Sequence, residues 1–362
     1  MQKFLSLIDE KTKRMMIMLG IAIGIFVVIL IIISITKGVS GEKVSYEKLS
    51  DIMVSAAEKY YDENKSVLTV GEKTTVQLNT LIEKKHMKEL TKYTSNTTCT
   101  GHVEIIKNGA ENLYIPSLTC DDYKTVTLFD KITEATVVSE NGLHLINGEY
   151  VFKGDNVNNY VSFGGQTWRI IKIDKNGNLK LINSKDIIGS TEWDNRYNIN
   201  TSYNDGINDF SLSRMNETLK EAYEGIDIVP TDSKKYVVYE PWCTGKRNFE
   251  DKSITPSGCN EKTENYFGLI APEDYAGASF DPNCVLIDSK SCSNYNYLTS
   301  FMTTSWTLIA TTENDYSALG IRNNIVLNQK TSANNRAFVS LIINGENLYK
   351  IGNGTKNDPY SF

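Results

Sequence analysis

Hydrophobic residues are most concentrated near the start of the chain, where Met15–Thr36 reads MMIMLGIAIGIFVVILIIISIT without a charged residue. At about 1.5 Å per residue, a helix of this length crosses a hydrocarbon core of about 30 Å. A cleaved signal peptide has a shorter apolar region, of about 7–15 residues, and ends at an Ala-x-Ala-like site, which is missing here. A buried core helix would keep some polar positions, but this run has no polar face. Residues 15–36 are therefore predicted to form an uncleaved transmembrane helix.

Amphipathic patterns follow this apolar run. Val44–Glu63 carries apolar residues three and four positions apart, which predicts a helix, and Thr75–Leu90 shows the same spacing over a shorter stretch. Two alternating runs, His102–Lys107 and Leu113–Ser117, flank a turn that contains Asn108-Gly109 and therefore predict a hairpin.

Short strands dominate the rest of the pattern. Gly164-Gly165 and Asn176-Gly177 supply the positive-φ turns that tight hairpins need. A helix is predicted over Phe210–Tyr223, and Asn265–Ser279 reads as a buried strand followed by a helical turn that begins at Pro272. The predicted strands are Tyr160–Phe163, Gln166–Ile173, Asn178–Asn183, Trp306–Ala310, Ala318–Ile321, Ile325–Asn328 and Arg336–Ile343.

The distribution of charge predicts the orientation of the chain in the membrane and argues against nucleic acid as a partner. The formal net charge is −6, and the first fourteen residues carry four basic and two acidic side chains, so the remainder carries about −8. Such an acidic body is poorly suited to bind nucleic acid through phosphate contacts. Because the basic residues precede the apolar run, the N-terminus is predicted to be cytoplasmic and residues after about 37 to be extracellular.

Cysteine usage agrees with an oxidising compartment, since six cysteines are present and none lies in the apolar run. Six cysteines allow 15 pairings. Their grouping into sequence neighbours favours Cys99–Cys120, Cys243–Cys259 and Cys284–Cys292. A zinc site is the alternative, but the Cys-x-x-Cys and Cys/His spacings that zinc requires do not occur.

The first part of the chain resembles a known family. A membrane helix, an amphipathic helix, the segment VQLNTLIEKKHMKEL and a hairpin flanked by cysteines are similar to the pilin-like or pseudopilin-like ectodomains of Gram-positive surface proteins. Pilins carry a Glu early in the apolar helix, which this chain lacks. A single anchored stalk is therefore expected, with self-assembly through the N-terminal helix as the alternative.

The second part, about residues 145–362, also shows a resemblance. The segments NYVSFGGQTWRIIKI, GLIAPEDYAGAS, SWTLIA, RAFVSLII and GNGTKNDPY occur in the order found in surface domains of Gram-positive gut bacteria. Those domains are similar to the C-type-lectin-like fold, which includes the formylglycine-generating enzymes. The resemblance implies a mixed sheet core with a long irregular loop region, about 226–304, that carries the binding.

Together these patterns predict an α+β protein. The expected parts are a cytoplasmic tail (1–14), a transmembrane helix (15–36), a pilin-like stalk domain (38–125), a linker (126–147) and a C-type-lectin-like head domain (148–362).

Catalytic residues are not predicted. The three histidines, His86, His102 and His144, all precede the head domain, so Ser/His/Asp and Cys/His mechanisms have no base there. The context of the last cysteine pair, NCVLIDSKSC, does not match the reactive-cysteine motif of the formylglycine-generating enzymes.

Calcium is the one cofactor that the sequence leaves open. The Glu-Pro-Asn and Trp-Asn-Asp motifs of sugar-binding C-type lectins are absent, and YNDGIND (203–209) lacks EF-hand spacing. An Asx-rich turn is the simpler interpretation of that segment, and Asp205 and Asp209 as calcium ligands are the alternative.

Aromatic and Asn-rich loops favour binding over catalysis. Tyr and Trp give a large contact area at little entropic cost, and Ser and Asn add adaptable hydrogen bonds. For each single ring, packing beneath the loops is the alternative. The candidate ligand-binding residues are Trp193, Tyr197, Tyr239, Trp242, Asn294, Tyr295 and Tyr297, with Tyr203 in the same set.

The sequence therefore predicts a membrane-anchored extracellular adhesion protein, not an enzyme, that binds a glycan or a protein through its head-domain loops. A structural pseudopilin-like subunit of a surface assembly is one alternative. A carboxylate-dependent cell-wall or glycan hydrolase is the other, and two close acids with shifted pKa in one cleft would support it.

Overall fold

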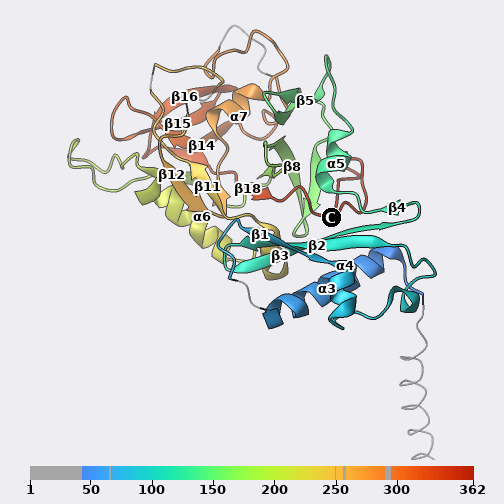
Figure 1. Cartoon of the computed structure of the whole chain (residues 1–362). Helices are drawn as coiled ribbons and strands as arrows, with labels where there is room; N and C mark the ends of the chain where they lie inside the picture. Colours follow the sequence, from blue (N-terminus) through green and yellow to red (C-terminus); the bar gives the residue numbers. More distant parts are fainter. Residues whose placement is uncertain (1–42, 65–66, 249, 256–257, 290–294) are drawn as a thin grey trace, which may run out of the picture.

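Two separate clusters of buried apolar side chains organise the chain. The computed structural model describes residues 43–64, 67–248, 250–255, 258–289 and 295–362. One cluster runs from Leu49 to Cys120 and the other from Leu128 to Tyr360. We call the parts around them the small lobe (43–125) and the large lobe (126–362) (Figure 1). Helices and sheets occur in both lobes, which confirms an α+β fold.

Four predicted features lie outside the described residues: the cytoplasmic tail 1–14, the apolar segment 15–36, Cys292 and Asn294. Within the described part of the chain, no helix is both long and apolar enough to cross a membrane.

The small lobe packs one long helix against an antiparallel sheet, and Figure 1 shows this sheet between the helix and the large lobe. The helix, α3 (Tyr46–Asn64), confirms the predicted one, because its buried residues Leu49, Met53 and Ala57 recur at helical spacing. The sheet has the order β1-β2-β3-β4. Its strands are β1 (Lys73–Gln77), β2 (Thr100–Asn108), β3 (Glu111–Cys120) and β4 (Tyr123–Lys124).

The helix predicted over Thr75–Leu90 is present but shorter than predicted. The β-branched run that ends at Val76 belongs to β1 and pairs with β2. Helix α4 covers only Leu78–Glu83, and Lys85 then adopts a positive φ of 62°. A single 3-10 turn, η1 (Leu90–Lys92), completes the segment.

The large lobe is built on two main sheets. The seven-stranded sheet has the order β13-β18-β9-β8-β6-β5 with β7 paired to β8, and the five-stranded sheet has the order β10-β17-β14-β15-β16. The seven-stranded sheet consists of β5 (Gly142–Ile146), β6 (Glu149–Lys153), β7 (Tyr160–Phe163), β8 (Gln166–Ile173), β9 (Leu179–Asn183), β13 (Phe267–Gly268) and β18 (Ser340–Ile343). The five-stranded sheet consists of β10 (Ser190–Glu192), β14 (Thr304–Ala310), β15 (Ser317–Arg322), β16 (Ile325–Lys330) and β17 (Asn334–Arg336).

The predicted meander is confirmed as β7, β8 and β9, and Trp168, Ile170 and Ile171 of β8 are buried in the large-lobe core. The predicted strand Arg336–Ile343 instead divides into β17 and β18, which join different sheets. A ribbon of β11 (Glu240–Cys243) and β12 (Lys262–Asn265) lies outside both sheets.

The helices of the large lobe are short. They are α5 (Leu128–Thr133), α6 (Arg214–Glu224) and α7 (Pro272–Gly277), with 3-10 turns η2 (Phe210–Leu212) and η3 (Thr231–Tyr236). Helix α6 begins later than predicted because the Ser213 hydroxyl caps it by accepting a hydrogen bond from the Asn216 amide.

The expected linker, 126–147, is structured. It contains α5 and β5, and Leu128, Ile132 and Leu143 are fully buried in the large-lobe cluster. The apolar residues of this segment are irregularly spaced in the sequence, but they are part of the large-lobe core.

The disulfides Cys99–Cys120 and Cys243–Cys259 confirm two of the predicted pairings. The first joins the ends of the β2–β3 hairpin. Cys284 is also disulfide-bonded, and its predicted partner lies outside the described residues.

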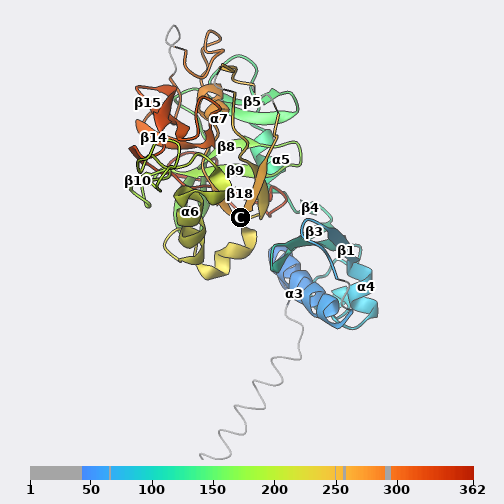
Figure 2. The same ribbon diagram turned by 90° about the vertical axis from the view of Figure 1, so that its left-hand side faces the viewer.

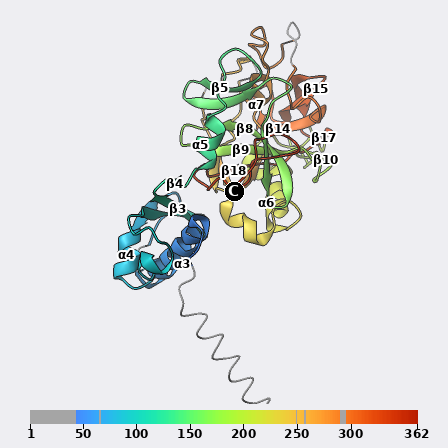
Figure 3. The same ribbon diagram turned by 90° about the vertical axis from the view of Figure 1, so that its right-hand side faces the viewer.

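The lobes meet over a restricted region near β3 and β4, as Figures 2 and 3 show from opposite sides. At the tip of the β2–β3 hairpin, the buried Asn108 side chain donates to the carbonyl oxygens of Lys235 (3.0 Å) and Val237 (2.7 Å). Its Oδ1 accepts from the Tyr239 amide at 3.0 Å. One carboxamide thus satisfies three backbone groups of the other lobe, and we call this set the Asn108 contact.

Replacing Asn108 tests this contact. Asn108→Ala leaves three partly or fully buried backbone groups without their partner, so we expect the free energy of unfolding to fall by about 2–4 kcal/mol. Urea unfolding measures the change. The control Asn64→Ala, which removes one exposed hydrogen bond within α3, should change it by less than about 0.5 kcal/mol. If both substitutions lowered the free energy of unfolding by the same amount, the Asn108 contact would not stabilise the protein as proposed.

Candidate functional site

The loop after β10, residues 195–209, is held by a buried carboxylate. The Asp194 side chain is fully buried, and its oxygens accept hydrogen bonds from the backbone amides of Arg196 (2.9 Å), Ile207 (3.1 Å) and Arg214 (3.0 Å). The Arg196 guanidinium also donates to Asp194 Oδ2 from two nitrogens, at 3.0 and 2.8 Å. Gly206 approaches so closely that a Cβ there would lie 2.2 Å from the Asp194 carbonyl oxygen.

Two buried asparagines complete this support. Asn198 donates to the Gly206 carbonyl at 2.7 Å and accepts from the Asn200 amide at 2.9 Å. Asn208 donates to three backbone carbonyls, one of which is that of Thr311 at 2.9 Å, and so ties the loop to the five-stranded sheet. The backbone of the loop is therefore fixed by polar contacts that solvent does not reach.

The same loop exposes large side chains. Tyr197, Ile199 and Tyr203 are 62%, 81% and 72% exposed, although the residues that hold their backbone are buried. Asn200, between them, donates to the carboxylate of Asp315. Exposed rings beside amide and carboxylate groups can contact both the apolar faces and the hydroxyls of a ligand.

The two calcium candidates do not form a cation site on their own. The Asp205 carboxylate lies 3.2 Å from Lys330 Nζ, and the Asp209 carboxylate accepts from the Ser211 hydroxyl at 2.7 Å. Among the described residues, no group of three or more His, Cys, Asp or Glu side chains could hold a metal ion.

Three of the predicted ligand contacts are buried. Trp193 is fully buried beside Phe210, and Trp242 donates from its indole to the Asn265 carbonyl at 2.9 Å. Tyr297 is 2% exposed, and its ring packs against the Arg169 guanidinium at 4.7 Å. All three rings belong to the large-lobe core, and Trp242 also lines the wall of a polar cavity.

The other predicted contacts are scattered. Tyr239 is partly buried beside the Tyr266 ring, and its amide belongs to the Asn108 contact. Tyr295 is 65% exposed and follows a segment outside the described residues, which also includes Asn294. The structure thus brings Tyr197 and Tyr203 together on one loop, whereas Tyr239 serves the contact between the lobes.

A buried charge cluster lies at the start of α7. Asp274 is buried and lies 2.5 Å from Lys180 Nζ and 3.7 Å from Lys172 Nζ. Burial alone would raise the pKa of Asp274, but the two ammonium groups outweigh it and lower the pKa from 3.8 to about 2. Asp274 also accepts a hydrogen bond from the Ala271 amide at the start of α7. Because Lys172 belongs to β8 and Lys180 to β9, this carboxylate joins α7 to both strands.

Next to this cluster lies a polar cavity of about 230 Å³. Glu240 lies in its wall, and burial and the nearby Asp174 raise the pKa of this carboxyl. Asn178 donates to Glu240 at 3.4 Å. The cavity is lined by Glu149, Lys172, Asp174, Asn178, Lys180, Glu240, Pro241, Trp242, Cys243 and Ile342.

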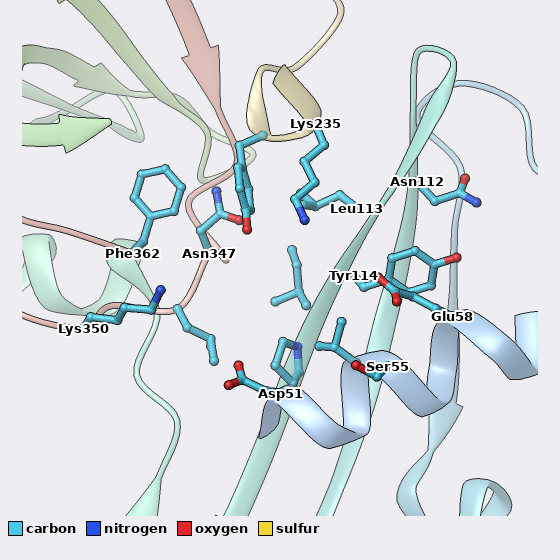
Figure 4. Close-up of a pocket in the computed structure, with 15 residues that line it drawn as sticks. Asp51, Ser55, Glu58, Asn112, Leu113, Tyr114, Lys235, Asn347, Lys350 and Phe362 are labelled. Atoms are coloured by element: carbon cyan, nitrogen blue, oxygen red, sulfur yellow. The ribbon is translucent and has the colours of Figure 1, made fainter. Parts of the chain in front are cut away.

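A larger groove of about 310 Å³ lies where the lobes meet (Figure 4). We call it the β3-edge groove, because five consecutive β3 residues, 112–116, line it. Figure 4 shows Asp51, Ser55 and Glu58 on the α3 side and Lys235, Lys350 and Phe362 on the large-lobe side. Its other lining residues are Val54, Tyr236, Asn347 and Leu348.

Neither the β3-edge groove nor the buried residues that hold the 195–209 loop could be identified from the sequence. Asp194, Asn198 and Asn208 appear in the sequence only as members of an Asx-rich stretch, and their partners lie far along the chain. A run of Asn and Asp around a glycine indicates that a loop is held by its own side chains, but it does not show which ones are buried.

Comparison with known proteins gives no family: no protein-family model matches the chain, and neither the curated proteins nor the solved structures contain a significant match.

The charge cluster gives a pH-dependent prediction. Asp274→Asn leaves two lysines without their buried partner, so we expect a loss of about 3–5 kcal/mol in unfolding free energy at pH 7. Because the folded pKa, about 2, lies below the unfolded value of 3.8, the stability due to this carboxylate is present above pH 3.8 and disappears as the pH falls toward 2.

The variant should therefore lack this part of the acid-induced loss of stability, which urea unfolding at a series of pH values measures. Asp155→Asn, at an exposed carboxylate, is the matched control and should leave the pH profile unchanged. The same pH profile for Asp274→Asn and the wild type would show that the cluster is not the origin of the effect.

Proposed function

We propose that this chain is a membrane-anchored extracellular binding protein that recognises a glycan through the 195–209 loop. The observation that carries the proposal is the contrast between the buried polar residues that fix the loop and the rings that it exposes. A loop held before binding loses little conformational entropy when a ligand arrives.

A glycan suits the chemistry of the loop. The faces of Tyr197 and Tyr203 can stack on a sugar ring, and the amide of Asn200 and the carboxylate of Asp315 can bond its hydroxyls. An oligosaccharide lying across both rings would use more of this surface than a single sugar.

The proposal includes a location outside the cell and a relationship to the two families that the chain resembles. The uncharged segment 15–36 supports a membrane anchor, and the disulfides Cys99–Cys120 and Cys243–Cys259 support an oxidising compartment. The pilin-like and C-type-lectin-like resemblances of the two parts are consistent with a stalk that carries a binding head.

A glycan and mucin array tests the proposal. We expect the full-length protein to bind a subset of glycans saturably, and Tyr197→Ala with Tyr203→Ala to weaken that binding at least tenfold, since stacking on both rings is lost. The control pair Leu145→Ala and Ile351→Ala removes exposed apolar side chains elsewhere and should bind like the wild type.

If the tyrosine variant binds glycans as the wild type does, the 195–209 loop is not the binding site. The absence of any bound glycan, with circular dichroism showing a folded protein, would count against the glycan itself.

A second candidate, a carboxylate-dependent glycan hydrolase, is favoured by one observation: Glu240 has a raised pKa and lines a cavity together with Asp174. If this candidate were correct, the wild type would release reducing ends from mucin glycans or cell wall, and Glu240→Gln would lower the rate by about 100-fold or more. We expect no release by either protein. Release that depends on Glu240 would overturn the assignment as a binding protein.

A further inference from the structure

One edge of the small-lobe sheet is open along most of its length. Gly109-Ala110 forms a two-residue turn that pairs Asn108 with Glu111, so Asn112, Tyr114, Pro116 and Leu118 direct their backbone groups away from β2. Strand β4 pairs only with Thr119 and Cys120.

Other contacts support this assignment of the edge. Leu118 exchanges hydrogen bonds with Thr125, at 3.0 and 3.1 Å, on the side away from β2. On the other side of β2, the backbone of Lys107 forms hydrogen bonds with Gly71 and Glu72. This agrees with the same register, in which the N–H and C=O of Lys107 point away from β3. Pro116 lacks an N–H, and within a strand proline is typical of an edge, where that N–H would face away from the neighbouring strand.

Two amides and three carbonyls therefore remain along the edge from Asn112 to Pro116. In the described chain, no hydrogen bond reaches the outward N–H and C=O groups of Asn112 and Tyr114 or the carbonyl of Pro116. These residues form the floor of the β3-edge groove, and at about 3.3 Å per residue they span about 16 Å.

The walls of the groove carry opposite charges. Asp51 and Glu58 recur on the face of α3 that lines the groove, and Lys235 and Lys350 lie across from them on the large lobe. Within the described residues, Glu58, Lys235 and Lys350 form no salt bridge, and Asp51 has only a long contact of 3.9 Å with Lys48.

We propose that the β3-edge groove binds an extended peptide segment of a partner protein, which adds a strand to β3. Successive side chains of a strand point to opposite faces of a sheet. The added strand would direct alternate residues toward α3 and the residues between them toward the large lobe. Charge complementarity then selects a segment with basic residues on its α3 face and acidic residues on its other face. This peptide site is independent of the glycan site proposed for the 195–209 loop.

A pair of synthetic peptides tests the proposal on the full-length protein. Thr-Lys-Glu-Val-Val-Lys-Glu-Thr places both lysines on one face and both glutamates on the other, whereas Thr-Lys-Lys-Val-Val-Glu-Glu-Thr has the same composition with each face mixed. We expect fluorescence anisotropy to show at least tenfold tighter binding of the first peptide.

Amide hydrogen exchange reports on strand formation directly. Bound peptide should slow exchange at the Asn112 and Tyr114 amides at least tenfold, and a backbone N-methylated version of the same peptide should not. Charge attraction alone would leave these two amides unchanged.

Charge reversal on the α3 wall provides the matched variants. Asp51→Lys with Glu58→Lys should weaken binding of the first peptide at least tenfold, because both walls become basic. Glu83→Lys with Asp122→Lys changes the net charge equally at exposed positions outside the groove and should bind like the wild type.

Equal affinity for the two peptides, or unchanged exchange at Asn112 and Tyr114, would overturn the proposal. Protection of these amides that rises with protein concentration in the absence of peptide would show that a second copy of the chain occupies the edge, and this result would overturn it too.

Discussion

The buried carboxamide of Asn108 joins the two lobes of the molecule by hydrogen bonds. It lies at the tip of the β2–β3 hairpin and satisfies three backbone groups of the large lobe. Two of its partners, Lys235 and Val237, belong to or directly follow η3, which also contributes Lys235 and Tyr236 to the β3-edge groove. The contact that joins the lobes therefore also positions one wall of the groove against the edge strand. A neutral hydrogen-bonding group is suitable here because it fills a buried space without the desolvation cost of a charge.

Buried polar groups also support the other sites. Asp194 fixes the 195–209 loop through its backbone amides, and Asp274 joins α7 to β8 and β9 through Lys172 and Lys180. In each case a buried acid has several donors, which is the condition under which an ionised carboxylate is tolerated inside a protein. Hydrogen bonds to the buried Asp194 thus hold the backbone of the loop that exposes Tyr197 and Tyr203.

Local patterns in the sequence predicted the local elements. Helix α3, the β2–β3 hairpin and the β7–β9 meander follow from apolar spacing and turn residues, because neighbouring residues determine them. The helix predicted from Thr75 begins only at Leu78, because pairing with β2 overrides the helical spacing before it. The buried state of Trp193, Trp242 and Tyr297 could not be predicted, since it depends on strands distant in sequence. The groove was not predictable either, because α3, β3 and the large lobe, which line it, lie far apart in the sequence.

The β3-edge groove requires a fixed arrangement of the two lobes, which a distance between spin labels tests directly. Labels attached through unnatural amino acids at Lys59 on α3 and Lys356 on the large lobe, both exposed, leave the disulfides intact. Double electron–electron resonance should then give one narrow distance distribution in the full-length protein and a broad one after Asn108→Ala. A broad or two-peaked distribution in the wild type would contradict the account, since the groove would then lack a defined wall.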